Sequence, residues 1–103
     1  MEQRSIDRIR QEFPEPDAAT AIASLERYAG PETARVQWDI LELSRGDLES
    51  LGQYVGIAQT DYRDVLYWAE YYKDDPLMKG RDPKQLVTEI LAKLNARKPS
   101  PNL

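Results

Sequence analysis

The chain has 103 residues, of which 41% are hydrophobic and 31% charged, and its formal net charge is −4. This length fits one domain, so we expect a single helical domain over residues 1–103. The absence of cysteine and histidine excludes disulfides and thiolate ligands, and argues against zinc sites and the common nucleophile–base arrangements. No apolar run approaches the roughly 20 residues that span a bilayer, and the charged N-terminus lacks the apolar stretch of a signal peptide. We therefore expect a cytoplasmic protein without a membrane partner.

Proline and glycine divide the first part of the chain into helices. Residues 1–16 are predicted to form a short N-terminal helix, capped by Ser5, and a proline-bounded linker. Asp17 is expected to cap a second helix, which Gly30 ends. Pro31 then opens a third helix, in the usual arrangement of glycine after a helix end and proline at a helix start.

The third helix is expected from about Pro31 to Ser44, with the Arg45-Gly46 pair as its exit. At about 100° per residue, its apolar side chains fall on two nearly opposite faces. One face carries Ala34, Trp38 and Leu41, and the other carries Val36, Ile40 and Leu43. Such a helix must be covered on both sides, so it is either central in the bundle or in contact with another chain. We expect a central helix, with Trp38 and Ile40 both largely buried.

A fourth and a fifth helix follow, and the pattern leaves open whether they are separate or one bent helix. Asp47 is expected to cap the fourth helix, and Thr60 or Asp61 to restart the chain as the fifth. Gly52 and Gly56 each weaken the helix between these points by about 1 kcal/mol. Their spacing suggests close approach of a second helix, or a bend.

The last helix begins with a capping-box-like pattern of Asp82 and Gln85, with Pro83 at the first helical position. One stripe of this helix is aliphatic and consists of Leu86, Val87, Ile90, Leu91 and Leu94. Residues 98–103 are expected to form a frayed tail. No segment alternates with a period of two, and the connections are short. The fold class predicted from these features is all-α, an up-and-down bundle of about five to six helices.

Charge is unevenly distributed along the chain. From residue 47 to 75 acids outnumber bases seven to two, whereas from residue 76 onward bases outnumber acids six to two. Opposite blocks within one small domain most often attract each other. Two alternatives stay open, namely a basic end that touches an anion and an acidic block that meets a basic partner, as in an antitoxin or immunity-type inhibitor. We expect no nucleic-acid partner, because the acidic surface would repel a phosphate backbone.

Two carboxylate pairs are spaced one helical turn apart, Asp39 with Glu42 and Asp61 with Asp64. Such pairs hold Mg²⁺ or Mn²⁺ only when several of them converge. No glycine-rich phosphate-binding loop is present. We therefore expect no catalytic residues, no metal and no cofactor. A metal-assisted hydrolase is the less favoured alternative, and it needs Asp61, Asp64 and carboxylates of the third helix around one cavity.

The segment 61–72 holds five of the nine aromatic residues in the chain. Its core-facing stripe is formed by Tyr62, Val65, Leu66, Ala69 and Tyr72. Tyr67 and Tyr71 point away from that stripe, beside Asp64 and an exposed edge of Trp68. Exposed tyrosine and tryptophan are enriched at the centres of protein interfaces, so these four residues form the predicted partner-binding surface, for a protein partner or a second copy. The alternative is that both tyrosines pack against the N-terminal helix or the long loop.

The run 35–71 also resembles a family of small uncharacterised bacterial helical proteins. The resemblance rests on Leu-Glu-Leu-Ser-Arg-Gly-Asp-Leu-Glu at residues 41–49 and Asp-Tyr-Arg-Asp-Val-Leu-Tyr-Trp-Ala-Glu at residues 61–70. It covers about a third of the chain. It implies a bacterial origin and a helical structure, and no activity is assigned to that family. From the residues themselves we expect a non-enzymatic helical protein that acts through protein–protein interaction, including self-association.

Overall fold

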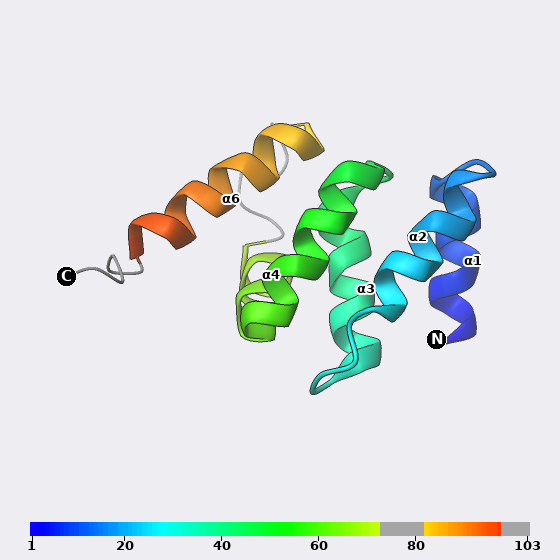
Figure 1. Ribbon diagram of the computed structural model, residues 1–103, viewed down its shortest axis with the longest axis horizontal. Helices are drawn as coiled ribbons and strands as arrows, with labels where there is room; N and C mark the ends of the chain where they lie inside the picture. The colour runs from blue at the N-terminus through cyan, green and yellow to red at the C-terminus, as the bar shows by residue number, and fades with distance from the viewer. Residues whose placement is uncertain (73–81, 98–103) are drawn as a thin grey trace.

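The computed structural model describes residues 1–72 and 82–97, and those residues form an all-α bundle without a strand (Figure 1). The helices are α1 (Gln3–Glu12), α2 (Asp17–Glu26), α3 (Thr33–Ser44), α4 (Leu48–Leu66), the π-helical turn η1 (Tyr67–Tyr71) and α6 (Pro83–Arg97). The predicted all-α bundle of five to six helices is confirmed. The tail predicted at residues 98–103 lies outside the described residues.

Helix α3 is the central helix of the bundle, because α1, α4, η1 and α6 all contact it. Its face of Val36, Ile40 and Leu43 is completely buried, with exposed fractions of at most 1%. A helix covered on its second apolar face within one chain does not need another chain there. The predicted central position of this helix is therefore confirmed.

The opposite face of α3 is covered less fully than predicted. Leu41 is buried, but Trp38 is only half-buried and Ala34 is exposed. Helix α1 covers the indole with charged groups, since the guanidinium groups of Arg4 and Arg8 lie 4.3 and 4.6 Å from the ring centroid. Long arginine side chains cover a ring while their charged ends stay in water, as in cation–π contacts. Ile40 is therefore completely buried, and Trp38 is mostly covered but partly exposed.

The helix ends follow the sequence signals only in part. Asp17 is the first residue of α2 and does not cap it, and α2 ends at Glu26 rather than at Gly30. The backbone of Arg45 and Gly46 is left-handed, at φ 46° and 82°, which confirms the predicted exit of α3. The amide of Ser50 donates to the Asp47 side chain over 2.9 Å, so Asp47 caps α4 as predicted. Ser5 does not cap α1, because the helix already begins at Gln3 and Ser5 lies on its buried side. Helix α3 begins at Thr33 rather than near Pro31.

Helix α4 changes direction at Asp61, whose φ of −156° and ψ of 101° are not helical. The Asp61 side chain accepts a hydrogen bond from the amide of Arg63 over 3.1 Å, which restarts the helix as predicted. The bend is not at either glycine. Gly52 and Gly56 are both exposed, and a Cβ added at either would meet nothing within 4 Å. The predicted close helix approach or bend at these glycines is therefore wrong.

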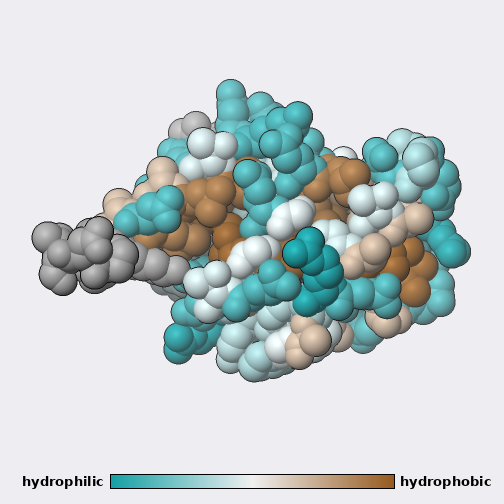
Figure 2. All heavy atoms as spheres, in the orientation of Figure 1, coloured by the Kyte–Doolittle hydropathy of each residue, from teal (hydrophilic) through white to brown (hydrophobic). Residues whose placement is uncertain are grey.

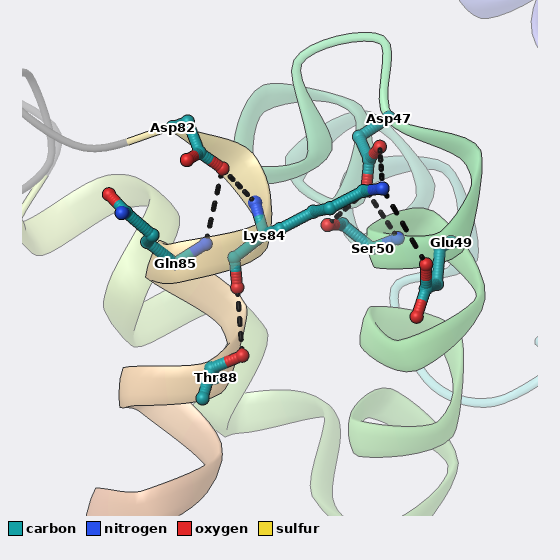
Figure 3. A network of polar contacts seen from close by, with 7 residues as sticks. All are labelled: Asp47, Glu49, Ser50, Asp82, Lys84, Gln85 and Thr88. Atoms are coloured by element: carbon teal, nitrogen blue, oxygen red, sulfur yellow. Dashed lines mark hydrogen bonds and ion pairs between the residues drawn. The ribbon is translucent and has the colours of Figure 1, made fainter.

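The starts of α4 and α6 lie next to each other (Figure 3). Asp82 accepts hydrogen bonds from the amides of Lys84 and Gln85, over 2.8 and 3.3 Å, so the predicted cap of α6 is confirmed. The Lys84 ammonium group lies 4.0 Å from Asp47 and 3.8 Å from Glu49. Here the basic last helix meets the acidic middle of the chain. The aliphatic stripe of α6 packs into the core, which buries all of it except a part of Leu91.

Candidate functional site

The predicted partner-binding residues lie around η1, the π-helical turn that continues α4 (Figure 1). This turn carries Tyr67, Trp68 and Tyr71, three of the four predicted residues. Single π-helical turns are rare and occur frequently at functional sites. We therefore take the surface of this turn as the candidate site.

Two tyrosines form the outer layer of the site. The rings of Tyr67 and Tyr71 are nearly parallel, with an interplanar angle of 15° and centroids 5.4 Å apart. Their exposed fractions are 43% and 76%. We call this pair the aromatic face. Its exposure contradicts packing of both tyrosines against the N-terminal helix, and the loop of the same alternative lies outside the described residues.

An inner aromatic layer supports the aromatic face. The ring of Tyr72 stacks on Trp68 with centroids 4.9 Å apart, and the ring of Tyr67 stands edge-on to both. The hydroxyl groups of Tyr67 and Tyr72 are hydrogen bonded over 2.9 Å. Edge-to-face and offset contacts of this kind are the favoured arrangements of aromatic pairs. Tyr67 is thus held in one orientation from below.

Trp68 and Asp64 are more buried than predicted. Trp68 is 9% exposed and Asp64 is 7% exposed, because this side of the chain faces the bundle core. Asp64 lines a cavity of about 290 Å³ between α4 and α6, together with Ile57 and Leu94. The expected exposed edge of Trp68 is therefore wrong, as is the expected place of Asp64 on the rim. Trp68 packs against Tyr67 on the core side of the aromatic face.

A polar clasp, formed by Arg35, Glu70 and Asp39, joins η1 to α3. The Arg35 guanidinium group donates to both carboxylate oxygens of Glu70, in one case over 2.7 Å from Nε. A third donor of Arg35, Nη1, reaches Glu32 over 2.9 Å. A bidentate pair of this kind fixes geometry better than a single contact does. Glu70 lies between Tyr67 and Tyr71 in the sequence, so the clasp also fixes the turn that carries both tyrosines.

Asp39 is the buried member of the clasp, at 5% exposure, and it is hydrogen bonded to Glu70. Burial and, after it, the neighbouring Glu70 carboxylate together raise the pKa of Asp39 to about 8. Arg35 lowers the pKa of Glu70, as does the hydrogen bond with Asp39. Two adjacent carboxyl groups share one proton in this way because they cannot both ionise at low cost. The buried Asp39 carboxyl group therefore holds a proton more tightly than an aspartate in water does.

Sequence reasoning did not identify the clasp. Arg35 and Glu70 are 35 positions apart, and neither belongs to a recognisable motif. The only signal was the strip of charged side chains that separates the two apolar faces of the third helix and includes Asp39. On a central helix such a strip has to meet a partner, although the sequence does not say which one.

The carboxylates that a metal-assisted hydrolase would need do not converge in the described residues. Across residues 1–72 and 82–97, no three acidic side chains come together in a way that could hold a metal ion. Asp61 lines a cavity of about 560 Å³ beside Tyr28 and Gly30, whereas Asp64 lines the separate cavity between α4 and α6. Asp39 and Glu70 line neither of these two cavities. The convergence of carboxylates that a metal-assisted hydrolase needs is therefore missing from this part of the chain.

Outside the aromatic face, the aliphatic stripe of α6 is partly exposed at Leu91. Figure 2 shows hydrophobic residues between the polar ones over α6 and also near α1.

Within the part of the chain that the structure describes, no helix combines the length and the apolar character needed to cross a membrane. Comparisons of the chain with protein-family models, with curated proteins and with solved structures find no match. The resemblance to a bacterial helical family therefore stays a prediction.

Proposed function

We propose that the protein acts by binding another protein through the aromatic face of Tyr67 and Tyr71. The observation that supports this proposal is a pair of nearly parallel tyrosine rings, 43% and 76% exposed, on a π-helical turn. Because both rings are exposed, they contribute little to the stability of the folded core. Large aromatic side chains at interface centres carry much of the binding free energy.

The support beneath the rings adds to the argument. Tyr67 is held by the hydroxyl of Tyr72 and by its edge-on contact with Trp68, and the clasp fixes η1 against α3. A side chain that is already ordered loses little conformational entropy when it binds. Tyrosine in particular offers a large contact area with few rotatable bonds. The aromatic face is thus pre-organised for contact with a partner.

The test is substitution of each exposed tyrosine, Tyr67→Ala and Tyr71→Ala, with Gln11→Ala as a control at an exposed position on α1. Loss of one central aromatic residue typically costs 2 kcal/mol or more, roughly a 30-fold drop in affinity. We expect both tyrosine variants to keep the helical circular dichroism spectrum and the melting temperature. In affinity capture they should lose the same protein that the wild type and Gln11→Ala retain.

The oligomeric state decides whether the partner is a second copy. Sedimentation of the wild type should show a monomer if the partner is another protein. A dimer that dissociates in both tyrosine variants would assign the aromatic face to self-association. Two stable variants that retain every captured protein and every oligomer would contradict the proposal, because the binding surface would then lie elsewhere.

A further inference from the structure

We propose that the clasp is a pH-sensitive latch, in which one proton shared by Asp39 and Glu70 keeps η1 closed against α3 and its loss loosens the turn. The change in the turn follows from the clasp alone. Its effect on a partner rests on the proposed function, because Glu70 lies between Tyr67 and Tyr71 on the same turn.

The proton satisfies a buried group that otherwise has no donor. Asp39 is 5% exposed, and its Oδ2 atom is buried without a hydrogen-bond donor when the residue is a carboxylate. A buried, unpaired carboxylate is costly, and the usual response is to bind a proton. Protonated Asp39 donates to Glu70, so the same proton removes the charge and joins the two elements.

The charges around Asp39 do not compensate for its ionisation. The groups that act on it are Glu70 of η1 and Arg35 and Glu42 of α3. Among the residues that the structure describes, Arg35 is the cation that acts on Asp39, and it already binds Glu70 and Glu32. Glu42 is paired with Arg8 of α1 over 2.8 Å. Ionised Asp39 would therefore face the Glu70 carboxylate across the junction between α3 and η1, and repulsion would weaken that junction.

The direction of the pH response follows from proton linkage. The pKa of Asp39 is raised to about 8 in the closed turn, whereas an aspartate in water titrates near about 4. The closed turn binds the proton more tightly, so rising pH favours the open turn between these two values, by at most about tenfold per pH unit for one proton. Above the raised pKa both forms are ionised and the response levels off.

The acid side has the opposite sign. Arg35 lowers the pKa of Glu70 in the closed turn, so protonation of Glu70 favours the open turn as the pH falls below about 4.5. The closed turn is most stable at a pH where Glu70 is ionised and Asp39 is protonated. Its stability falls as the pH rises from there through neutrality.

Hydrogen exchange on the free protein tests the latch without any partner. The wild type and Asp39→Asn are compared at pH 6, 7 and 8, with a peptide of residues 67–72 as the reporter and one of α2 as the internal control. Comparison of the two proteins at the same pH cancels the intrinsic pH dependence of exchange. Asparagine is neutral and keeps a donor for Glu70, so the variant should stay closed at every pH.

We expect the protection of residues 67–72 in the wild type to fall relative to Asp39→Asn as the pH rises from 6 to 8, by up to about tenfold per unit. The α2 peptide should exchange equally in both proteins. Identical pH profiles of residues 67–72 in the two proteins would overturn the proposal. A uniform loss of protection in every peptide would do so as well, since it would show global destabilisation in place of a local latch.

A second variant keeps the proposal testable if Asp39→Asn does not fold. Glu70→Gln removes the negative charge that holds the Asp39 proton, so the pH window in which the turn opens should move to lower pH. An unchanged window would contradict the latch. These outcomes are separate from those of the tyrosine variants. A flat exchange profile rejects the latch and leaves the aromatic face intact, whereas retained partners in the tyrosine variants reject the aromatic face and leave the latch intact.

Discussion

Helices α3 and α4 are the two elements that make most contact with each other, yet they are covered very differently. Four of the six apolar residues of α3 are buried, including its whole Val36, Ile40 and Leu43 face. Helix α4 buries one side, with Leu51 and Tyr54, and leaves Gly52 and Gly56 open to solvent. The difference teaches that α3 has both apolar faces against neighbouring elements, whereas α4, which also contacts α2, η1 and α6, leaves the side with Gly52 and Gly56 open to solvent.

The segment that continues α4 packs against α3 in a different way. After the bend at Asp61 it approaches α3 again through η1, and there the contact includes a polar clasp as well as apolar packing. Strained or unusual backbone tends to persist at functional sites because surrounding contacts hold it in place. The candidate site thus lies where the covering helix returns to the central one.

Replacement of Ile40 tests the core side of the comparison. Ile40 is 0% exposed on the central face of α3, so Ile40→Ala removes buried methyl groups and leaves a cavity. We expect the free energy of unfolding to fall by about 2–5 kcal/mol, measured by urea denaturation. Ala34→Ser, at an exposed position of the same helix, is the control and should change little. A loss well below 1 kcal/mol for Ile40→Ala would show that α3 is not the central helix.

Several parts of the structure could be predicted because their causes are local. A capping side chain and the amides that it binds are within three residues, as for Asp47 and Asp82, so the pattern alone indicates the helix start. The restart at Asp61 follows the same rule. Ser5 has the right side chain for a cap, but it lies on the buried side of α1 instead. That position is set by tertiary packing, which the local pattern does not show.

The candidate site was predicted in part. Periodicity placed Tyr67 and Tyr71 outside the core-facing stripe, and both are exposed. The burial of Trp68 was missed, because a π-helical turn changes the phase of the residues within it and the sequence gives no signal for such a turn. The pairing of Arg35 with Glu70 depends on the approach of two elements far apart in the sequence, which no local pattern specifies.

Replacement of Gly56 tests the outer side of the comparison. A Cβ at this position meets no atom within 4 Å, and its φ lies in the ordinary helical range. Since glycine in a helix interior is about 1 kcal/mol less favourable than alanine, Gly56→Ala should raise the free energy of unfolding by about that amount. Gly46→Ala is the contrasting control, because Gly46 has a φ of 82° and little space beside Glu12, and it should be destabilising. Destabilisation by Gly56→Ala would mean that the outer face of α4 is covered after all.

The smallest effect is expected at the start of α6, where Lys84 lies near Asp47 and Glu49 at the edge of α4 (Figure 3). The Lys84 side chain is 65% exposed and its contacts are 4.0 and 3.8 Å long, so water and salt screen the pair. Exposed pairs of this kind contribute about 0–1 kcal/mol. We expect Lys84→Ala to lower the free energy of unfolding by a few tenths of a kcal/mol, and about 1 M salt to abolish the difference because the screening length falls to about 3 Å. A double-mutant cycle with Glu49→Ala isolates the pairwise contribution, since Glu49 is itself exposed and makes no cap. A coupling energy above 1 kcal/mol that persists in high salt would show that the edge of α4 contributes specific packing, and the contrast between a central α3 and a covering α4 would then fail at this junction.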